Sequence, residues 1–181
     1  DGLVSTINNL RVVGVQPEIP RMVLARAVLS CNSLDKASTL LQKAPPSGGF
    51  HFSLSQLGDN RLISIERGGA FYHQTDIKAA SVHANHILHD NSIEQIITTS
   101  SHDRQVNGQS LIAADELDPI EILRSKSDHS LPIWRRDEDD PDRENTMASA
   151  LFEISNNKLD WSIYSGASDK ILFQGQLDRK I

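Results

Sequence analysis

The sequence predicts a single α+β domain in which antiparallel β-sheets pack against helices. Its strand-like segments run together in groups, and its helical segments also run together, instead of alternating with one another. Hairpin-type turns separate neighbouring segments, for example at residues 58–60 (GDN) and 68–69 (GG). The chain of 181 residues has the size of one domain. We expect roughly eight strands and four or five helices.

The first elements in chain order are a strand and two helices. Residues 3–8 (LVSTIN) are rich in β-branched side chains and predict a strand. Residues 21–31 predict a helix whose apolar face consists of Val23, Ala27, Val28 and Cys31. A second helix, 33–44, begins at Ser33, and the prolines and glycines of residues 44–49 end it.

The middle of the chain predicts four strands in succession, over residues 50–57, 61–67, 70–75 and 79–85. In the first of them Phe52 and Leu54 alternate with polar residues, which is the pattern of a strand with one buried face. Residues 92–125 then predict helical pieces that are broken at Gly108 and Pro119.

The last part of the sequence combines a polar loop with three strands. Residues 129–145 are charged and contain proline, so we expect an exposed acidic loop. The acidic run 137–140 lacks the D-x-D-x-D-G spacing of a calcium-binding loop, and a solvated loop is the expected structure. Strands are predicted at residues 147–155, 159–166 and 170–177.

Composition and charge exclude several classes of partner. The net charge is -6 and no basic stripe occurs, which argues against nucleic acid and against an anionic membrane surface. No run of 18 apolar residues is present, so no membrane span is expected. A single cysteine excludes an internal disulfide and fits a reducing compartment, with the cytoplasm favoured. No Rossmann, Walker or G-x-S-x-G motif occurs, and we expect no cofactor.

The sequence begins within a strand pattern and without an initiator methionine. We therefore expect it to be the later part of a longer gene product. A targeting segment upstream of Asp1 would not be visible here.

Residues 82–89 read VHANHILH and contain three histidines at intervals of three. On a strand, His83 and His89 would point to one side and His86 to the other. Zinc sites need converging ligands, and neither H-E-x-x-H nor a nearby cysteine accompanies these histidines, so a metal site is the weaker alternative. Asn85, at the end of the predicted strand, has a side-chain amide that can donate a hydrogen bond to an oxyanion.

Several motifs occur together in one order along residues 1 to roughly 155. They are GLVSTINNL, a G-x-x-P-E-x-P turn, the helix pair LARAVLSCNSLDKASTLLQ, FSLSQLGDNRLISIE, VHANH, an S-x-x-R at 101–104 and a T-x-A-S at 146–149. In this order the chain resembles the acyl-coenzyme A:6-aminopenicillanic acid acyltransferase family. That family (peptidase C45-like) belongs to the N-terminal nucleophile (Ntn) hydrolases and is related to the choloylglycine hydrolases.

The resemblance implies a four-layer αββα sandwich, of which this chain would be the later portion, as one catalytic domain over residues 1–181. It also implies autoproteolytic processing that frees an N-terminal cysteine, whose thiol is the nucleophile and whose α-amino group is the base. The expected activity is amide hydrolysis or acyl transfer, on a small-molecule amide or acyl thioester. Cys31 lies on the apolar face of a predicted helix, so the nucleophile is expected in a missing N-terminal segment or chain.

The resemblance also assigns site residues. Asn85 would stabilise the oxyanion, and Asn8 would do the same or position the substrate. The remaining candidates fall into two groups. Substrate-binding residues would be Thr146 and Ser149, and structural residues near the site would be His83, His86, Glu66 and Arg26. Because a buried carboxylate needs a partner, we expect Glu66 to pair with Arg26.

Two alternatives remain open beside the enzyme. In the first the chain is a catalytically inactive relative, and in the second it is a separate subunit; either would bind an acyl or peptide ligand without cleaving it. The parent reading frame discriminates between them, because only the enzyme needs an upstream cysteine at a strand start. The acyl donor, the acceptor and the oligomeric state stay open, with a homo-oligomer as one option.

Overall fold

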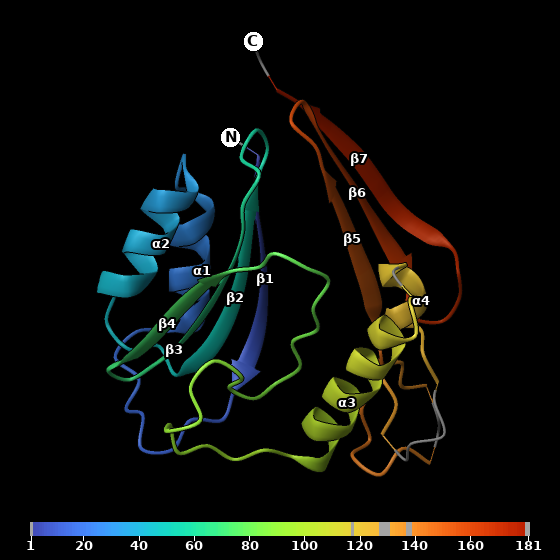
Figure 1. Cartoon of the computed structure of the whole chain (residues 1–181), viewed down its shortest axis with the longest axis horizontal. Coiled ribbons are helices and arrows are strands. Elements are labelled where there is room, and N and C mark those ends of the chain that lie inside the picture. Colours follow the sequence, from blue (N-terminus) through green and yellow to red (C-terminus); the bar gives the residue numbers. More distant parts are fainter. Residues whose placement is uncertain (1, 117, 127–130, 137–138, 180–181) are drawn as a thin grey trace.

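The computed structural model describes residues 2–116, 118–126, 131–136 and 139–179. They form two antiparallel sheets, which face each other across the molecule (Figure 1). The first sheet has the order β1-β2-β3-β4, with β1 Leu3–Leu10, β2 Gly49–Gln56, β3 Leu62–Gly68 and β4 Phe71–Asp76. The second has the order β5-β6-β7, with β5 Ala148–Ile154, β6 Lys158–Ser165 and β7 Ile171–Asp178. The predicted α+β class with antiparallel sheets is thus confirmed.

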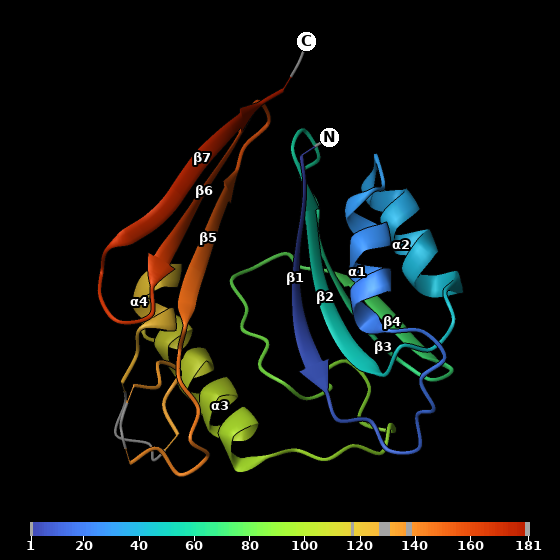
Figure 2. The ribbon, with the colours of Figure 1, turned by 180° about the vertical axis from the view of Figure 1, so that it is seen from behind.

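Helices α1 (Arg21–Leu29) and α2 (Leu34–Lys43) cover the outer face of the first sheet (Figure 2). The alternation in β2 and β3 places every second side chain against these helices. The fully buried cluster between sheet and helices consists of Leu24, Val28, Leu34, Ala37, Leu41, Phe52, Leu54, Ile63 and Ile65. Burial of each large member contributes about 1.5–3 kcal/mol, so this layer is the main apolar core.

The ends of α1 and α2 follow from the local sequence. The hydroxyl of Ser33 accepts a hydrogen bond from the backbone N–H of Lys36 and so caps α2. The predicted apolar face of the first helix was wrong in part. Leu24 and Val28 are its buried residues, whereas Val23 is 58% exposed, because the helix starts after Pro20 and directs positions 24 and 28 to the sheet.

The segment 79–85, which the sequence predicts as a strand, is not one. Residues 77–98 join β4 to α3 (Thr99–Ala113), and they form one isolated bridge, between Val12 and Gln95. Near its two ends the main chain of this connecting segment bonds to other backbone groups, and between them it is held largely by side chains. For example, Gln105 of α3 accepts from the N–H of Ala84 and donates to the carbonyl of Val82.

Helix α3 runs through Gly108, where the sequence predicts a break. A Cβ at position 108 would lie 2.8 Å from Cγ1 of Val82, so glycine is needed here for close approach of the connecting segment. The break at Pro119 is confirmed, because α4 (Pro119–Leu123) begins there, with Asp118 capping Ile120.

The loop before β5 is less exposed than the sequence predicts. Arg135 and Asp140 are buried and form a two-bond ion pair at 2.6 Å each. Arg135 also donates to Asp142, Glu144 and the Ser100 hydroxyl of α3, and so ties this loop to the helix. Residues 127–130 and 137–138 of the predicted acidic loop lie outside the described residues.

The second sheet has less cover than the first. Helix α4 packs against β5, but all residues of β7 except Gly175 are exposed. Within the described residues, no helix has the length and apolar character that crossing a membrane would require.

Candidate functional site

The inner face of the first sheet is polar. Strand register places Asn8, His51, Glu66 and His73 in one row across β1, β2, β3 and β4. A neighbouring row contains Thr6, Ser53, Ser64 and Thr75. Except for Thr75, each of these residues has an apolar neighbour along its strand that packs toward α1 and α2. One period-two pattern therefore builds the core on one side of the sheet and a polar surface on the other.

A cavity of about 620 Å³ lies over this polar face. Its first wall belongs to the sheet and includes Thr6, Asn8, His51, Ser53 and Ser64. The connecting segment supplies Val82, His83, Leu88 and His89, and the far side is formed by Gln109, Ile112, Leu123 and Ala150. The cavity is therefore bounded by the first sheet, the connecting segment, both later helices and β5.

Glu66 is the fully buried anchor of this site. Its carboxylate accepts hydrogen bonds from Nε2 of His83 (2.7 Å) and from the backbone N–H groups of Leu88 (2.7 Å) and His89 (3.0 Å). Burial by itself would raise the pKa of Glu66, but these hydrogen bonds outweigh it and hold the pKa below its ordinary value. The expected Glu66–Arg26 pair was wrong, because Arg26 is exposed on α1 and Glu66 faces the opposite side of the sheet.

Imidazoles surround Glu66. The rings of His51 and His83 stack in parallel, with their centroids 3.5 Å apart. The Ser64 hydroxyl lies 2.8 Å from Nε2 of His51 and 2.8 Å from Nε2 of His89. Burial, followed by the proximity of His83, lowers the pKa of His51 to about 3, so its ring is neutral near pH 7. Burial also lowers the pKa of His89.

Asn8 fastens the connecting segment to β1. Its side-chain Nδ2 donates to the carbonyls of His83 (2.6 Å) and Ala84 (2.7 Å), which uses both amide hydrogens. Asn8 lines the cavity, as expected of a site residue. In this arrangement it positions the connecting segment, and its Oδ1 is the atom that can accept a hydrogen bond from a ligand.

Asn85 lies at the edge of the same junction and is not among the residues that line the cavity. Its Nδ2 donates to the carbonyl of Asn9 (3.1 Å), its Oδ1 accepts from Arg104 (2.9 Å), and its backbone N–H donates to the Ser101 hydroxyl. The same hydroxyl lies 2.7 Å from Nδ1 of the buried His86. The S-x-x-R motif at 101–104 thus braces the asparagine and the histidine of VHANH together.

The remaining predicted residues lie farther out. The Thr146 hydroxyl accepts from the backbone N–H of Arg135, and Ser149 is buried on β5. Neither Thr146 nor Ser149 lines the cavity, and among the described residues of β5 and the loop before it Ala150 is the one that does. Cys31 packs against the core on the helical side of the first sheet, and its thiol lies 3.5 Å from the carbonyl of Ala27. The sheet therefore separates this thiol from the cavity.

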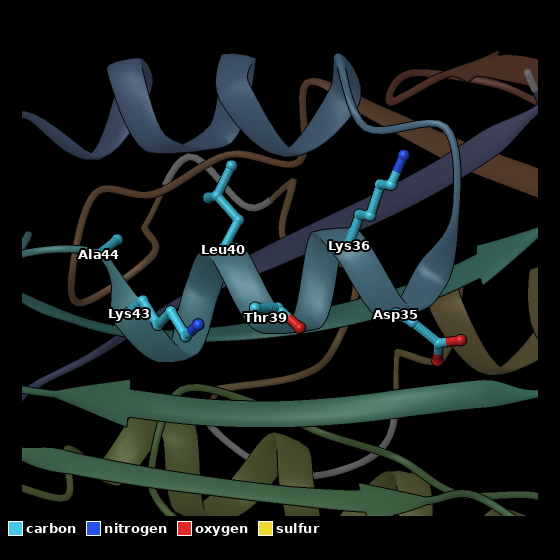
Figure 3. A pocket seen from close by; sticks show the side chains of 6 residues that line it. All are labelled: Asp35, Lys36, Thr39, Leu40, Lys43 and Ala44. Carbon is cyan, nitrogen blue, oxygen red and sulfur yellow. The ribbon is translucent and has the colours of Figure 1, made fainter.

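A second hollow lies on the outer surface of α2 and is a poorer candidate. All six of its lining residues come from this helix and the residue after it: Asp35, Lys36, Thr39, Leu40, Lys43 and Ala44. Their side chains spread along the helix without converging on a common point (Figure 3). Convergent polar groups are what a binding site requires, so the cavity over the polar sheet face is the candidate site.

Sequence reasoning missed most of the cavity lining, including the polar residues His51, Ser64 and His89. The signal was present in the alternation of β2 and β3, where each apolar residue assigned to the core leaves its neighbour on the other face. Counting parity outward from Phe52 identifies His51, and counting from Ile65 identifies Ser64 and Glu66.

Comparisons with known proteins identify the family of the chain. A search of curated proteins finds no match for the chain. A family model described as acyl-coenzyme A:6-aminopenicillanic acid acyl-transferase matches residues 1–168, which include both asparagines, Glu66 and the whole first sheet. The chain therefore belongs to the acyl-coenzyme A:6-aminopenicillanic acid acyltransferase family.

Proposed function

We propose that this chain forms the substrate-holding part of a cysteine-dependent acyltransferase or amide hydrolase of the N-terminal nucleophile type. The observation that carries the proposal is the junction of β1 with the VHANH segment beside the cavity. There Asn8 grips the main chain at residues 83 and 84, and Asn85 returns a hydrogen bond to Asn9. The family to which the chain belongs supports acyl transfer as the chemistry.

The nucleophile in this proposal is a cysteine outside the present sequence. Cys31 is separated from the cavity by the first sheet, so its thiol cannot reach a substrate bound there. An N-terminal cysteine would attack the carbonyl carbon of the substrate and form a tetrahedral intermediate. Collapse to the thioester would release an amine or a thiol, and water or an acceptor amine would then take the acyl group.

Asn85 would donate to the oxyanion in both steps. An amide nitrogen carries two hydrogens, and one of them already binds the carbonyl of Asn9. Arg104 fixes Oδ1 and thereby the orientation of the amide, so the second hydrogen points in one defined direction without cost at the moment of reaction. Asn8 would act as a positioning residue, and Thr146 and Ser149 would contribute on the side of the second sheet.

The fold in this proposal is an αββα sandwich. The two antiparallel sheets would be the inner layers, α1 and α2 one outer layer, and α3 with α4 a part of the other. The polar face of the first sheet would then be an inner face of the sandwich. Processing by self-cleavage would expose the cysteine next to it.

The test reconstitutes the site from its parts. The chain alone should not turn over acyl p-nitroanilides or acyl-coenzyme A thioesters. Joined to the polypeptide that carries the cysteine, it should release nitroaniline, and mass spectrometry should detect an acyl thioester on that cysteine. In the reconstituted protein, Asn85→Ala should lower kcat by about 100- to 1000-fold, the cost of losing one oxyanion donor.

Asn91→Ala is the matched control, because Asn91 lies exposed in a turn of the same connecting segment. It should leave kcat unchanged. Turnover by the chain alone, or equal kcat values for the two asparagine variants, would contradict the proposal.

A ligand-binding role without catalysis is the second candidate. It is favoured by one observation: both amide hydrogens of Asn8, the asparagine that lines the cavity, are already used by the connecting segment. In that case the acyl ligand should bind with the same affinity to wild type and Asn85→Ala, and reconstitution should yield no thioester.

A further inference from the structure

Three potential metal ligands converge at the floor of the cavity. They are the carboxylate of Glu66 and the imidazoles of His83 and His89, and one ligand atom from each lies within 4.8 Å of the other two. The Glu66 side chain is fully buried and that of His83 is 11% exposed. His83 and His89 also line the cavity, so the cluster is reached from that side.

The backbone around this cluster is fixed independently of any ligand. Glu66 lies within β3, paired with His51 of β2 and His73 of β4. Its carboxylate receives the N–H groups of Leu88 and His89, which brings the second histidine to it. The side-chain amide of Asn8, on β1, donates a hydrogen bond to the carbonyl of His83 and so fixes the first histidine.

Each histidine has a partner on the ring nitrogen that a metal would not use. Nδ1 of His83 lies 3.1 Å from the carbonyl of Ala84, which leaves Nε2 directed at Glu66. Nε2 of His89 lies 2.8 Å from the Ser64 hydroxyl, which leaves Nδ1 available. Metal-bound histidines characteristically have such a second hydrogen bond, because it fixes the tautomer and the ring orientation.

His83 is also surrounded by acceptors. An oxygen acceptor stands at each of its ring nitrogens, the Ala84 carbonyl at one and the Glu66 carboxylate at the other. A neutral imidazole has a single N–H and can satisfy one of them, whereas an imidazolium satisfies both. A metal ion bound to Nε2 and the carboxylate is the other arrangement that meets both acceptors, and it also neutralises the buried charge.

His51 gives a second, independent indication of a ligand. It is 2% exposed, it lines the cavity, and its Nδ1 has no hydrogen-bond partner among the residues that the structure describes. A buried ring nitrogen without a partner costs free energy unless a bound group satisfies it.

We propose that Glu66, His83 and His89 bind one divalent first-row transition cation, with zinc the best fit. Two imidazoles and one carboxylate are the donor set of zinc sites with three protein ligands, which keep a fourth position for a small molecule. Magnesium and calcium take oxygen ligands almost entirely and should not bind here. Ligand atoms in a tetrahedral zinc site lie roughly 3.4 Å apart. On binding, Nε2 of His83 and the Glu66 oxygen, now 2.7 Å apart, must therefore separate to admit the ion, while the more widely spaced ligand atoms, all within 4.8 Å, close around it.

This site differs from the one that histidine spacing alone suggests. His86 is turned to Ser101 and takes no part, and the carboxylate from β3 replaces it. The proposal is independent of acyl transfer, and its test uses no activity as a readout.

The experiment titrates zinc into the purified chain after removal of metals with a chelator. Isothermal titration calorimetry should give one zinc per chain, and elemental analysis after dialysis should find the same ratio. Magnesium should give no heat above dilution. Cobalt added instead of zinc should produce the visible absorption of a four-coordinate site, which reports the site without any variant.

His89→Gln should weaken zinc binding by at least about ten-fold, since even the loss of an outer partner of a metal ligand costs 10- to 100-fold. The matched control is His102→Gln, because His102 is 64% exposed and lies beside a carboxylate, that of Asp103, on the surface. It should bind zinc like the wild type. Absence of zinc binding by the folded wild type, or an equal loss in both variants, would overturn the proposal. If His89→Gln does not fold, an octahedral cobalt spectrum of the wild type would overturn it equally.

Discussion

The two sheets of this protein are stabilised in different ways. The first sheet packs one face against α1 and α2 through a cluster of fully buried apolar side chains. The second sheet has a strand, β7, that is exposed along nearly its whole length, with Phe173 66% exposed. Both sheets are antiparallel, but the first is backed by an apolar layer and the second has little apolar cover.

Polar and charged contacts help to stabilise the second sheet, whereas apolar packing stabilises the first. Arg124 pairs with Asp169 and stacks over Tyr164, and the indole N–H of Trp134 donates to the carbonyl of Gly166. Arg135 joins the adjoining loop to α3. Charged contacts are screened by salt and lost when a partner titrates, whereas apolar packing has no charge to screen or titrate. The two sheets should therefore respond differently to the same change of pH or ionic strength.

The largest difference is expected for a pair of phenylalanines. Phe52→Ala removes a fully buried ring from the core of the first sheet and should lower the free energy of unfolding by about 3–5 kcal/mol. Phe173→Ala, on β7, should change it by no more than about 0.5 kcal/mol. Urea denaturation of both variants measures this, and equal losses would mean that β7 is covered in solution.

An intermediate difference is expected for a pair of glutamates. Glu66→Gln replaces two acceptor oxygens by one and sets an NH₂ group against backbone donors, so it should cost about 1–3 kcal/mol. Glu153→Gln, at an exposed position of β5, should be close to neutral. Urea denaturation in the presence of a chelator gives both values. If Glu66→Gln left the free energy of unfolding unchanged, the carboxylate would have to be protonated in the folded state.

The smallest effect is expected from pH. The hydrogen bond from Arg135 lowers the pKa of Asp140 below its ordinary value of 3.8. A carboxyl group with a lowered folded-state pKa contributes stability that is fully present above 3.8 and is lost as the pH falls through the folded-state value.

The wild type should therefore lose stability as the pH falls below 3.8, and the difference between wild type and Asp140→Asn should shrink as it does so. Urea midpoints measured across it provide the check. Glu66 titrates in the same direction, and it does so in both proteins, so the difference isolates Asp140. A difference that stays constant with pH would assign the stabilisation to the main-chain contacts of the loop.

Much of the fold could be predicted from local sequence. The grouping of strands, the hairpin turns and the alternation in β2 all depend on residues close together, and the class and most elements follow from them. The strand predicted at 79–85 failed because its main-chain partners are side chains far away, such as Asn8 and Gln105. Gly108 stays helical for a similar reason, the approach of Val82.

The candidate site could be predicted only in part. Asn8, His83 and Glu66 were each singled out from the sequence, and in the structure Asn8 donates to the carbonyl of His83, whose Nε2 contacts Glu66. The choice of Arg26 as the partner of Glu66 ignored parity, since Ile65 faces the helices and its neighbour must face away. Burial of Arg135 was not predictable, because it depends on a loop folding back on α3.

The connecting segment is held at several points through its main chain. Asn8, Glu66 and Gln105 form hydrogen bonds to backbone carbonyl and N–H groups of residues 82–84 and 88–89, and His83 is the one of these residues whose side chain also contacts Glu66. Apart from the missing N–H of proline, every amino acid offers these same atoms. Substitutions at Val82 and Leu88 can therefore reshape the wall of the cavity while its frame stays in place, which gives relatives a simple route to different ligand preferences.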